Sequence, residues 1–258
     1  MKRTLYFVYG SLCHAMFLAV FLYMVGFLAN SFVPKSIDGP ASPGGPGVPA
    51  ALIDLGLLVL FGIQHSVMAR PTFKRWWTRI VPAPIERSTY VLASNLVLVL
   101  LLWQWRPLPG VLWDVRGTVA EPVLWSLFGF GWLLIVFASL LIDHFDLFGT
   151  RQVWMHLCGK AYTPPAFRAP ALYKAVRHPL YVGWLLAFWV TPVMTLGHLL
   201  FSLGNTAYIL IAIRLEERNL AQVHPEYAAY RRRVPMLVPF GKAGSSARAP
   251  ERVEGTAS

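Results

Sequence analysis

Long apolar stretches alternate with short polar segments along most of the chain. A helix that crosses a bilayer needs about 20 predominantly apolar residues. Four runs meet that length and form candidate spans: residues 5–29, 50–69, 88–105 and 122–142. The first run is longer than the apolar region of a signal peptide and has no small-residue cleavage site, so we expect it to be retained. The pattern predicts an all-α, polytopic integral membrane protein.

A fifth apolar region, between His178 and Glu216, is interrupted near its middle. Its two legs, residues 180–191 and 199–213, are separated by Pro192 and further turn-forming residues. As helices the legs are about 18 Å and 22 Å long, which is less than the hydrocarbon thickness of about 30 Å. We predict a helical hairpin, which gives five to six membrane helices in total.

The basic residues cluster in alternate connections. Lys and Arg are concentrated at the N-terminus, in residues 70–87 and 150–177, and in the segment that contains Arg231, Arg232 and Arg233. The positive-inside rule places these parts in the cytoplasm. Between residue 151 and the basic tail the chain must therefore cross an even number of times, which favours the hairpin. We expect residues 216–233 to form a helix on the cytoplasmic surface, and residues 241–258 to be disordered.

Composition supports the membrane interpretation. Hydrophobic residues make up 56% of the chain and charged residues 14%, with a net charge of +11. The basic residues lie between apolar spans and not along one face, so no nucleic-acid partner is expected. Cys13 and Cys158 form no CxxC pair, so we predict no metal site. GxGxxG, HExxH, P-loop and GxSxG motifs are absent, which excludes the soluble dinucleotide-binding type of site.

A hairpin would bring the polar ends of its legs together. His178 and Tyr181 at one end would meet Glu216 and Glu217 at the other. Such a site suits a ligand that carries both charges and an aromatic base, because Arg177 and His178 can bind a carboxylate and a tyrosine can stack on a ring. The alternative is that these residues are interfacial anchors or a surface ion pair.

The motifs RHPLYVG, RLEERNL and YAAY, in this order, resemble the isoprenylcysteine carboxyl methyltransferase and phospholipid methyltransferase superfamily. The resemblance implies an S-adenosylmethionine cofactor bound by residues of this hairpin. The implied cofactor-binding set is Arg177, His178, Tyr181, Gly183, Arg214, Glu216 and Glu217. The HPxY pattern recurs at His224 to Tyr227, where we expect a coincidence.

The first half carries a second resemblance. Gly62, His65 and Ser66, followed by Arg70-Pro71, by Glu86-Arg87-x-x-Tyr90 and by QWRPLP, are similar to NnrU-like membrane proteins and more so to bacterial methanethiol S-methyltransferases. This implies residues 1–149 as an NnrU-like half and 150–240 as the cofactor module. It further implies methyl transfer to methanethiol, a small volatile thiol, giving dimethyl sulfide and S-adenosylhomocysteine in a bacterial inner membrane, with the cofactor site in the cytoplasm.

The thiolate is the attacking form of a thiol, so such an enzyme needs a proton acceptor. His65 and His144 are candidates, with Asp143 as an orienting partner and Tyr90 as a pocket wall. Asp143 and Asp146 lie three residues apart and could instead bind a metal or make structural hydrogen bonds. His14 and His198 are expected to be helix contacts.

Other functions remain open at this point. The acceptor could be an isoprenylcysteine carboxylate or a phospholipid headgroup, either of which needs a wide apolar opening. A sterol reductase with NADPH is a more distant reading, and a non-enzymatic NnrU-like membrane protein or transporter is the alternative from another class. The sequence leaves the oligomeric state undetermined.

Overall fold

The computed structural model describes residues 1–39 and 48–239. The expected disordered tail at residues 241–258 lies outside the described residues, as do residue 240 and residues 40–47. In the described part the helices, in chain order, are α1 Lys2–Ala29, α2 Val48–Met68, α3 Pro71–Trp77, η1 Ala83–Ile85, α4 Glu86–Gln104, α5 Ala120–Ile142, α6 His144–Leu147, α7 Thr150–Leu157, η2 Ala171–Lys174, α8 Pro179–Trp189, α9 Leu196–Val223 and α10 Tyr227–Arg233.

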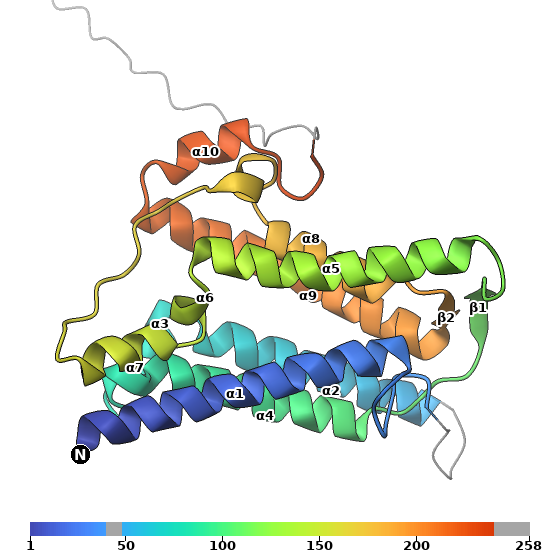
Figure 1. Cartoon of the computed structure of the whole chain (residues 1–258), viewed down its shortest axis with the longest axis horizontal. Coiled ribbons are helices and arrows are strands. Elements are labelled where there is room, and N and C mark those ends of the chain that lie inside the picture. The colour runs from blue at the N-terminus through green and yellow to red at the C-terminus, as the bar shows by residue number, and fades with distance from the viewer. Residues whose placement is uncertain (40–47, 240–258) are drawn as a thin grey trace, which may run out of the picture.

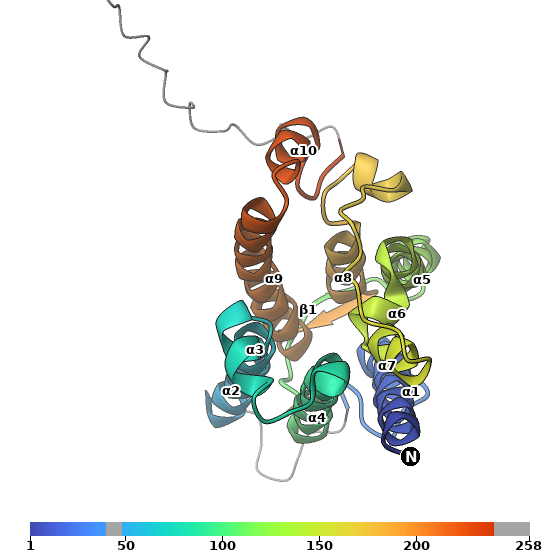
Figure 2. The same ribbon diagram turned by 90° about the vertical axis from the view of Figure 1, so that its left-hand side faces the viewer.

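The predicted fold class is confirmed. Five helices of the described chain are long and apolar enough to span a membrane: α1, α2, α4 with its preceding 3-10 turn, α5 and α9. The eleven-residue α8 is about 16 Å long and too short to span alone. Figure 2, which looks along the bundle, shows α2, α4 and α1 on one side and α9, α8 and α5 on the other. The chain is an all-α integral membrane protein.

Figure 1 shows that the connections expected on one membrane side lie at one end of the molecule. The N-terminus, α3, α6 and α7 are at that end, whereas the strands β1 (Val111–Asp114) and β2 (Val193–Thr195) are at the other. The strands pair antiparallel, with Val111 opposite Thr195 and Asp114 opposite Val193. This ribbon, which the sequence pattern did not predict, ties the α4–α5 connection to the bend of the hairpin.

The hairpin is present, but its second leg is longer than predicted. The helix α9 begins at Leu196, where the Thr195 side chain accepts a hydrogen bond from the His198 amide at 3.0 Å. It then continues to Val223, because no residue interrupts it before Pro225. Glu216 and Glu217 therefore belong to α9. The expectation of one surface helix over residues 216–233 was wrong, because residues 216–223 continue α9 and the short α10 follows after a break.

Close contact between α5 and α8 places the start of α8. A methyl group built on Gly183 would come within 2.9 Å of the Gly131 carbonyl oxygen and 2.8 Å of Ile135. Small residues let membrane helices approach closely in this way. At the other end of α8, His198 and Ser202 of α9 both hydrogen bond the Phe188 carbonyl, at 2.8 Å and 2.6 Å. The contacts of Gly183 hold the hairpin against α5, and the bonds to Phe188 hold its two legs together.

Candidate active site

The RHPLY turn lies between η2 and α8 and is fastened to the end of the described chain. Pro179 occupies the first helical position, where a missing N–H costs nothing. The amides of Arg177 and His178 donate to the carbonyls of Pro235 and Met236, at 2.9 Å and 3.2 Å. The segment after α10 therefore runs alongside the turn and covers it.

Arg177, His178 and Glu217 form a buried joint between α8, α9 and this C-terminal segment. Nε of Arg177 donates to Oε1 of Glu217 at 2.7 Å, and Nε2 of His178 lies 3.1 Å from the same oxygen. All three residues are at most 8% exposed. Nη1 of Arg177 donates to the carbonyls of Arg231 and Val234, at 2.9 Å and 2.6 Å. The guanidinium thus joins three segments that are distant in sequence.

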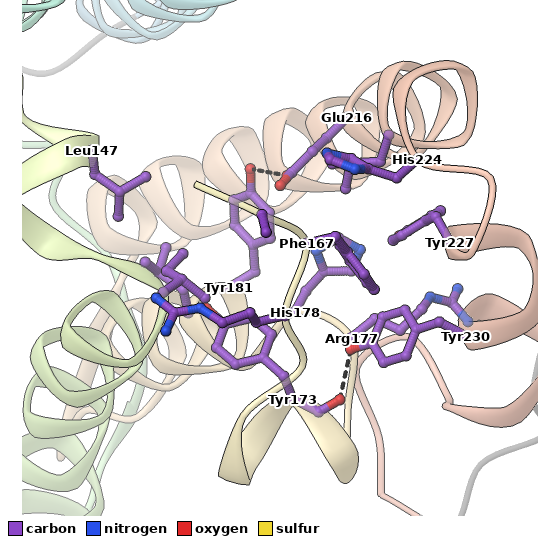
Figure 3. A pocket seen from close by; sticks show the side chains of 15 residues that line it. Leu147, Phe167, Tyr173, Arg177, His178, Tyr181, Glu216, His224, Tyr227 and Tyr230 are labelled. Atoms are coloured by element: carbon purple, nitrogen blue, oxygen red, sulfur yellow. Dashed lines mark hydrogen bonds between the residues drawn. The ribbon is translucent and has the colours of Figure 1, made fainter. Parts of the chain in front are cut away.

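The neighbouring glutamate has different surroundings. The Tyr181 hydroxyl donates to Oε2 of Glu216 at 3.1 Å, and the Glu216 side chain is otherwise open. Both residues line a cavity at the end of the bundle that carries the basic connections, and Figure 3 shows their contact. Glu216 is therefore an accessible carboxylate beside a phenol, one position before the carboxylate that closes the joint.

The cavity has a volume of about 320 Å³. This lies at the lower end of the range for small-molecule sites, about 300–1,000 Å³. Its walls combine aromatic rings, charged groups and apolar side chains: Ile142, Leu147, Ala166, Phe167, Arg168, Tyr173, Arg177, His178, Leu180, Tyr181, Glu216, Leu220, His224, Tyr227 and Tyr230. Ile142 and Leu147 precede residue 150, so the N-terminal half also contributes to the cavity.

Four aromatic side chains from two segments form one wall of the cavity, which we call the aromatic wall: Phe167, His224, Tyr227 and Tyr230. The Phe167 ring lies 5.6 Å from His224, 5.7 Å from Tyr227 and 5.4 Å from Tyr230 between centroids. The second HPxY copy, expected to be coincidental, thus supplies two cavity residues. Its proline ends α9 and turns the chain into α10, which brings Tyr227 back toward the site.

The tyrosines of this region remain neutral at physiological pH. Burial raises the pKa of Tyr230 to about 12, and it also raises the pKa of Tyr173 above its usual value. The Tyr230 hydroxyl donates to the Tyr173 carbonyl at 2.6 Å, which connects α10 to η2. These phenols can therefore act as hydrogen-bond donors and apolar surface, but not as anions.

The structure brings together most, but not all, of the residues predicted to bind the cofactor. Arg177, His178, Tyr181 and Glu216 line the cavity. Glu217 does not line it, but hydrogen bonds Arg177 and His178. Gly183 faces α5 and Arg214 is exposed, and neither lines the cavity.

His65 lies in a separate polar cluster between α2, α4 and α9. The Tyr90 hydroxyl is 2.7 Å from Nε2 of His65, and Nδ1 is 3.1 Å from the Ser94 hydroxyl. The ring of Tyr208, on α9, packs edge-on against His65 with centroids 6.2 Å apart. Tyr208 precedes Glu216 by about two helical turns, or about 12 Å.

Asp143 lies between α5 and α6, and His144 is the first residue of α6. Nε2 of His144 lies 3.1 Å from Nε2 of His14, and Nδ1 lies 2.9 Å from the Ser139 hydroxyl. Burial lowers the pKa of His144, and His14 lowers it further. Asp143 caps α6 and forms an ion pair with Arg151 at 3.4 Å. It does not orient either candidate base.

Several cavity residues escaped the sequence analysis. Phe167 and Arg168 come from the irregular connection between α7 and η2, where hydrophobic periodicity carries no information. Tyr173 sits just before the RHPLY turn, and its place in the cavity follows from the way the joint folds this turn onto α10. For Tyr227 and Tyr230 an indication existed, since both belong to the YAAY motif, to which the sequence assigned no role in the site.

The fold and the site define a class: an integral membrane protein with a polar and aromatic cavity at one end of its helical bundle. Comparison with known proteins identifies the family within this class. Methanethiol S-methyltransferase 2 of Bradyrhizobium diazoefficiens is 54% identical over 92% of this chain and 91% of its own length. Methanethiol S-methyltransferases of Crocosphaera subtropica (51% identity) and Mycobacterium tuberculosis (49%) each match 93% of this chain, and 94% and 98% of their own lengths.

The chain belongs to the methanethiol S-methyltransferase family and is a membrane methyltransferase. A more distant relative is the bovine protein nurim, 36% identical over 65% of this chain and 66% of its own length. No family model and no solved structure matches the chain.

Proposed function

We propose that this protein transfers the methyl group of S-adenosylmethionine to methanethiol, giving dimethyl sulfide and S-adenosylhomocysteine. The observation that carries the proposal is the cavity that holds the accessible Glu216–Tyr181 pair, in a chain about half identical to enzymes named for this substrate. A small apolar thiol partitions into lipid, so a membrane-embedded enzyme meets its substrate where the substrate accumulates.

The residues of the cavity fit the methyl donor. That molecule has a flat base, a sulfonium and an aminocarboxylate, and the cavity offers aromatic rings, a carboxylate and arginine. Glu216 would attract the sulfonium, and Arg168 would bind the carboxylate, since the Arg177 guanidinium is already occupied by Glu217 and two carbonyls. When bound, the donor supplies an electrophilic methyl group, whose transfer leaves a neutral thioether.

For the proton acceptor we propose His65, acting through Tyr90. Ser94 and Tyr90 occupy its two ring nitrogens, with Tyr90 at Nε2. The thiol proton would pass to the Tyr90 oxygen while Tyr90 passes its own proton to Nε2, so that one proton ends on the imidazole. Tyr208 would line the path between this cluster and Glu216. His144 is better suited to packing, because His14 and Ser139 occupy both of its ring nitrogens.

We further propose that the protein resides in a bacterial inner membrane with its N-terminus and cavity facing the cytoplasm, as the distribution of Lys and Arg indicates. Cys158 is exposed at the same end, whereas Cys13 is buried. A membrane-impermeant maleimide should label Cys158 in inside-out vesicles but not in right-side-out vesicles. Labelling in the right-side-out vesicles alone would reverse the orientation.

The reaction is tested by headspace gas chromatography. Purified protein in detergent, given S-adenosylmethionine and methanethiol, should produce dimethyl sulfide, and Glu216→Gln should lower the rate at least tenfold. Glu121→Gln is the matched control, because Glu121 lies at the start of α5, at the other end of the bundle. Absence of product in the unmodified protein would refute methanethiol as the acceptor.

The base assignment has its own test. His65→Gln should lower the maximal rate about 100-fold or more, in the range of general-base catalysis, while S-adenosylhomocysteine binding is retained. His198→Gln serves as a control for a buried histidine outside the site. An unchanged rate in His65→Gln would remove His65 from the reaction.

A further inference from the structure

Ser94 contacts the proposed base but has no task in the proposed reaction. It lies on α4, one helical turn after Tyr90, and is 6% exposed. Its oxygen lies 3.1 Å from Nδ1 of His65, whereas the Tyr90 hydroxyl lies 2.7 Å from Nε2 of the same ring. The helix α2, which carries His65, runs beside α4 (Figure 2). Two residues of one helix therefore bind both nitrogens of a ring on the neighbouring helix.

These contacts allow two arrangements of the protons. A neutral imidazole has a single N–H, so one ring nitrogen donates and the other accepts. In the first arrangement, Nδ1 of His65 donates to the Ser94 oxygen and Nε2 accepts from the Tyr90 hydroxyl. In the second, Nε2 donates to the Tyr90 oxygen and Nδ1 accepts from the Ser94 hydroxyl. Only the first leaves Nε2 free to take up a proton.

The first arrangement gives every proton of the cluster a partner. The Ser94 hydroxyl donates to the Tyr90 carbonyl, one turn back along α4, at 3.0 Å, so its oxygen can accept from Nδ1. In the second arrangement the Tyr90 hydroxyl has only the His65 carbonyl, at 3.4 Å, which is longer than an ordinary O–H···O bond. Tyr90 is buried, and a buried donor without a partner is costly. The first arrangement is therefore the more stable one.

We propose that Ser94 is a positioning residue for the proton transfer: its oxygen holds the Nδ1 proton of His65 and thereby keeps Nε2 free to accept. This rests on the proposed function, in which His65 is the base. The thiol S–H bond breaks and its electron pair stays on sulfur, while the thiol proton goes to the Tyr90 oxygen and the Tyr90 proton goes to Nε2. The imidazolium that forms keeps its Nδ1–H bond to Ser94, so no side chain has to turn during the step.

The competing account is that Ser94 is only a packing residue. Serine hydroxyls inside helices often bond the carbonyl one turn back, and Ser94 does so. That account explains the bond to the Tyr90 carbonyl. It assigns no preferred tautomer to His65, and it predicts that loss of the hydroxyl changes stability without changing turnover.

The first experiment separates turnover from binding, with headspace gas chromatography at varied methanethiol concentrations. Ser94→Ala should lower kcat about tenfold, the order expected when a hydrogen bond to a reacting group is lost. The KM for methanethiol and the affinity for S-adenosylhomocysteine should stay unchanged. Ser94→Thr should restore most of the kcat, since a threonine hydroxyl can also bond the carbonyl one turn back.

Ser139 offers a matched control. Its hydroxyl oxygen lies 2.9 Å from Nδ1 of His144 and bonds the Val136 carbonyl at 2.7 Å, so it repeats the contacts of Ser94 at a histidine outside the proposed reaction. Ser139→Ala should leave kcat unchanged.

The second experiment locates the proton directly and needs no substrate. Nitrogen NMR of the histidine-labelled protein at neutral pH distinguishes the two tautomers, and the His65 signal is identified by its absence from His65→Gln. The unmodified protein should show a protonated Nδ1 and an unprotonated Nε2. In Ser94→Ala the tautomer protonated at Nε2 should become populated, whereas Ser94→Thr should retain the original one.

Each outcome decides between the accounts. A His65 protonated at Nε2 in the unmodified protein would overturn the proposal, and this measurement decides even if Ser94→Ala fails to fold. An unchanged kcat in Ser94→Ala, or a loss that Ser94→Thr does not restore, would make Ser94 a packing residue. Absence of dimethyl sulfide from the unmodified protein, with His65 protonated at Nδ1, would instead refute the proposed function.

Discussion

Glu216 and Glu217 are consecutive residues on α9, yet they belong to two different regions of the molecule. Glu217 faces the buried joint, where Arg177 and His178 share one of its oxygens. Glu216 faces the cavity, and its one side-chain partner in the described chain is Tyr181. Adjacent positions on a helix point about 100° apart, so one carboxylate can build the site while the next remains available to a ligand.

This difference between Glu216 and Glu217 changes how the pair of glutamates is interpreted. A pair of glutamates near an RHPxY turn suggests two equivalent ligands for a cofactor. In this fold one glutamate bonds the buried Arg177 and His178 side chains that close the hairpin, and it thereby helps to form the cavity in which the other acts. Substitutions at the two positions should therefore fail in different ways, and the following predictions separate them.

The largest effect is expected for Glu217→Ala, on stability. Removing Glu217 leaves the Arg177 guanidinium buried without a counter-charge, which typically costs about 3–5 kcal/mol. We expect a large fall in the thermal midpoint in detergent and rapid proteolysis after α9. Asp114→Asn, which removes the exposed pair with Arg116, should leave the midpoint unchanged. If Glu217→Ala is as stable as the unmodified protein and only binds its cofactor more weakly, Glu217 has a ligand-binding role and not a structural one.

Glu216→Gln should act on binding and leave folding unchanged. The amide keeps the shape of the side chain but removes the charge, which a sulfonium feels and a neutral thioether does not. We expect S-adenosylmethionine to bind about tenfold more weakly, or about 1.4 kcal/mol, while S-adenosylhomocysteine loses much less. Titration calorimetry with both ligands checks this. Equal losses for the two would assign Glu216 to the ribose instead of the sulfonium.

Tyr181→Phe should have a smaller effect of the same kind. It removes the 3.1 Å hydrogen bond that orients Glu216 but keeps the ring in the cavity. A partly exposed bond of this type is worth about 1 kcal/mol, which corresponds to about a fivefold loss in kcat/KM. Phe145→Tyr, a phenol added outside the cavity, is a suitable control. No change in kcat/KM would mean that Glu216 does not need this partner.

The smallest effect is expected for His144→Gln, and it depends on pH. The pKa of His144 is lowered in the folded protein, chiefly by burial, so the unfolded chain binds a proton there more readily. Stability should consequently be unaffected above about pH 6.5 and fall as the pH decreases below it. The variant should lose less of its thermal midpoint between pH 7.5 and 5.5 than the unmodified protein, and stay active at pH 7.5. Inactivity at pH 7.5 would restore His144 as a catalytic candidate.

The sequence predicted what is encoded by periodicity and by charge. It located the spans and the hairpin, and it brought His178 near Glu217 although a whole apolar hairpin separates them in the chain. It missed the end of α9, because apolar character fades at Ile213 whereas helical hydrogen bonding continues until Pro225. It also missed Phe167 and Arg168, since an irregular connection takes its place only after the joint and α10 have formed. It could not show that Gly183 packs on α5, which depends on the distance between two helices.

The most direct test of the central claim is an experimental structure with S-adenosylhomocysteine bound. The account predicts the ligand in the cavity, with its sulfur beside Tyr181 and Glu216 and with the joint of Arg177, His178 and Glu217 unchanged. A ligand bound instead in the His65 cluster, or coordinated directly by Glu217 with the joint broken, would contradict the account.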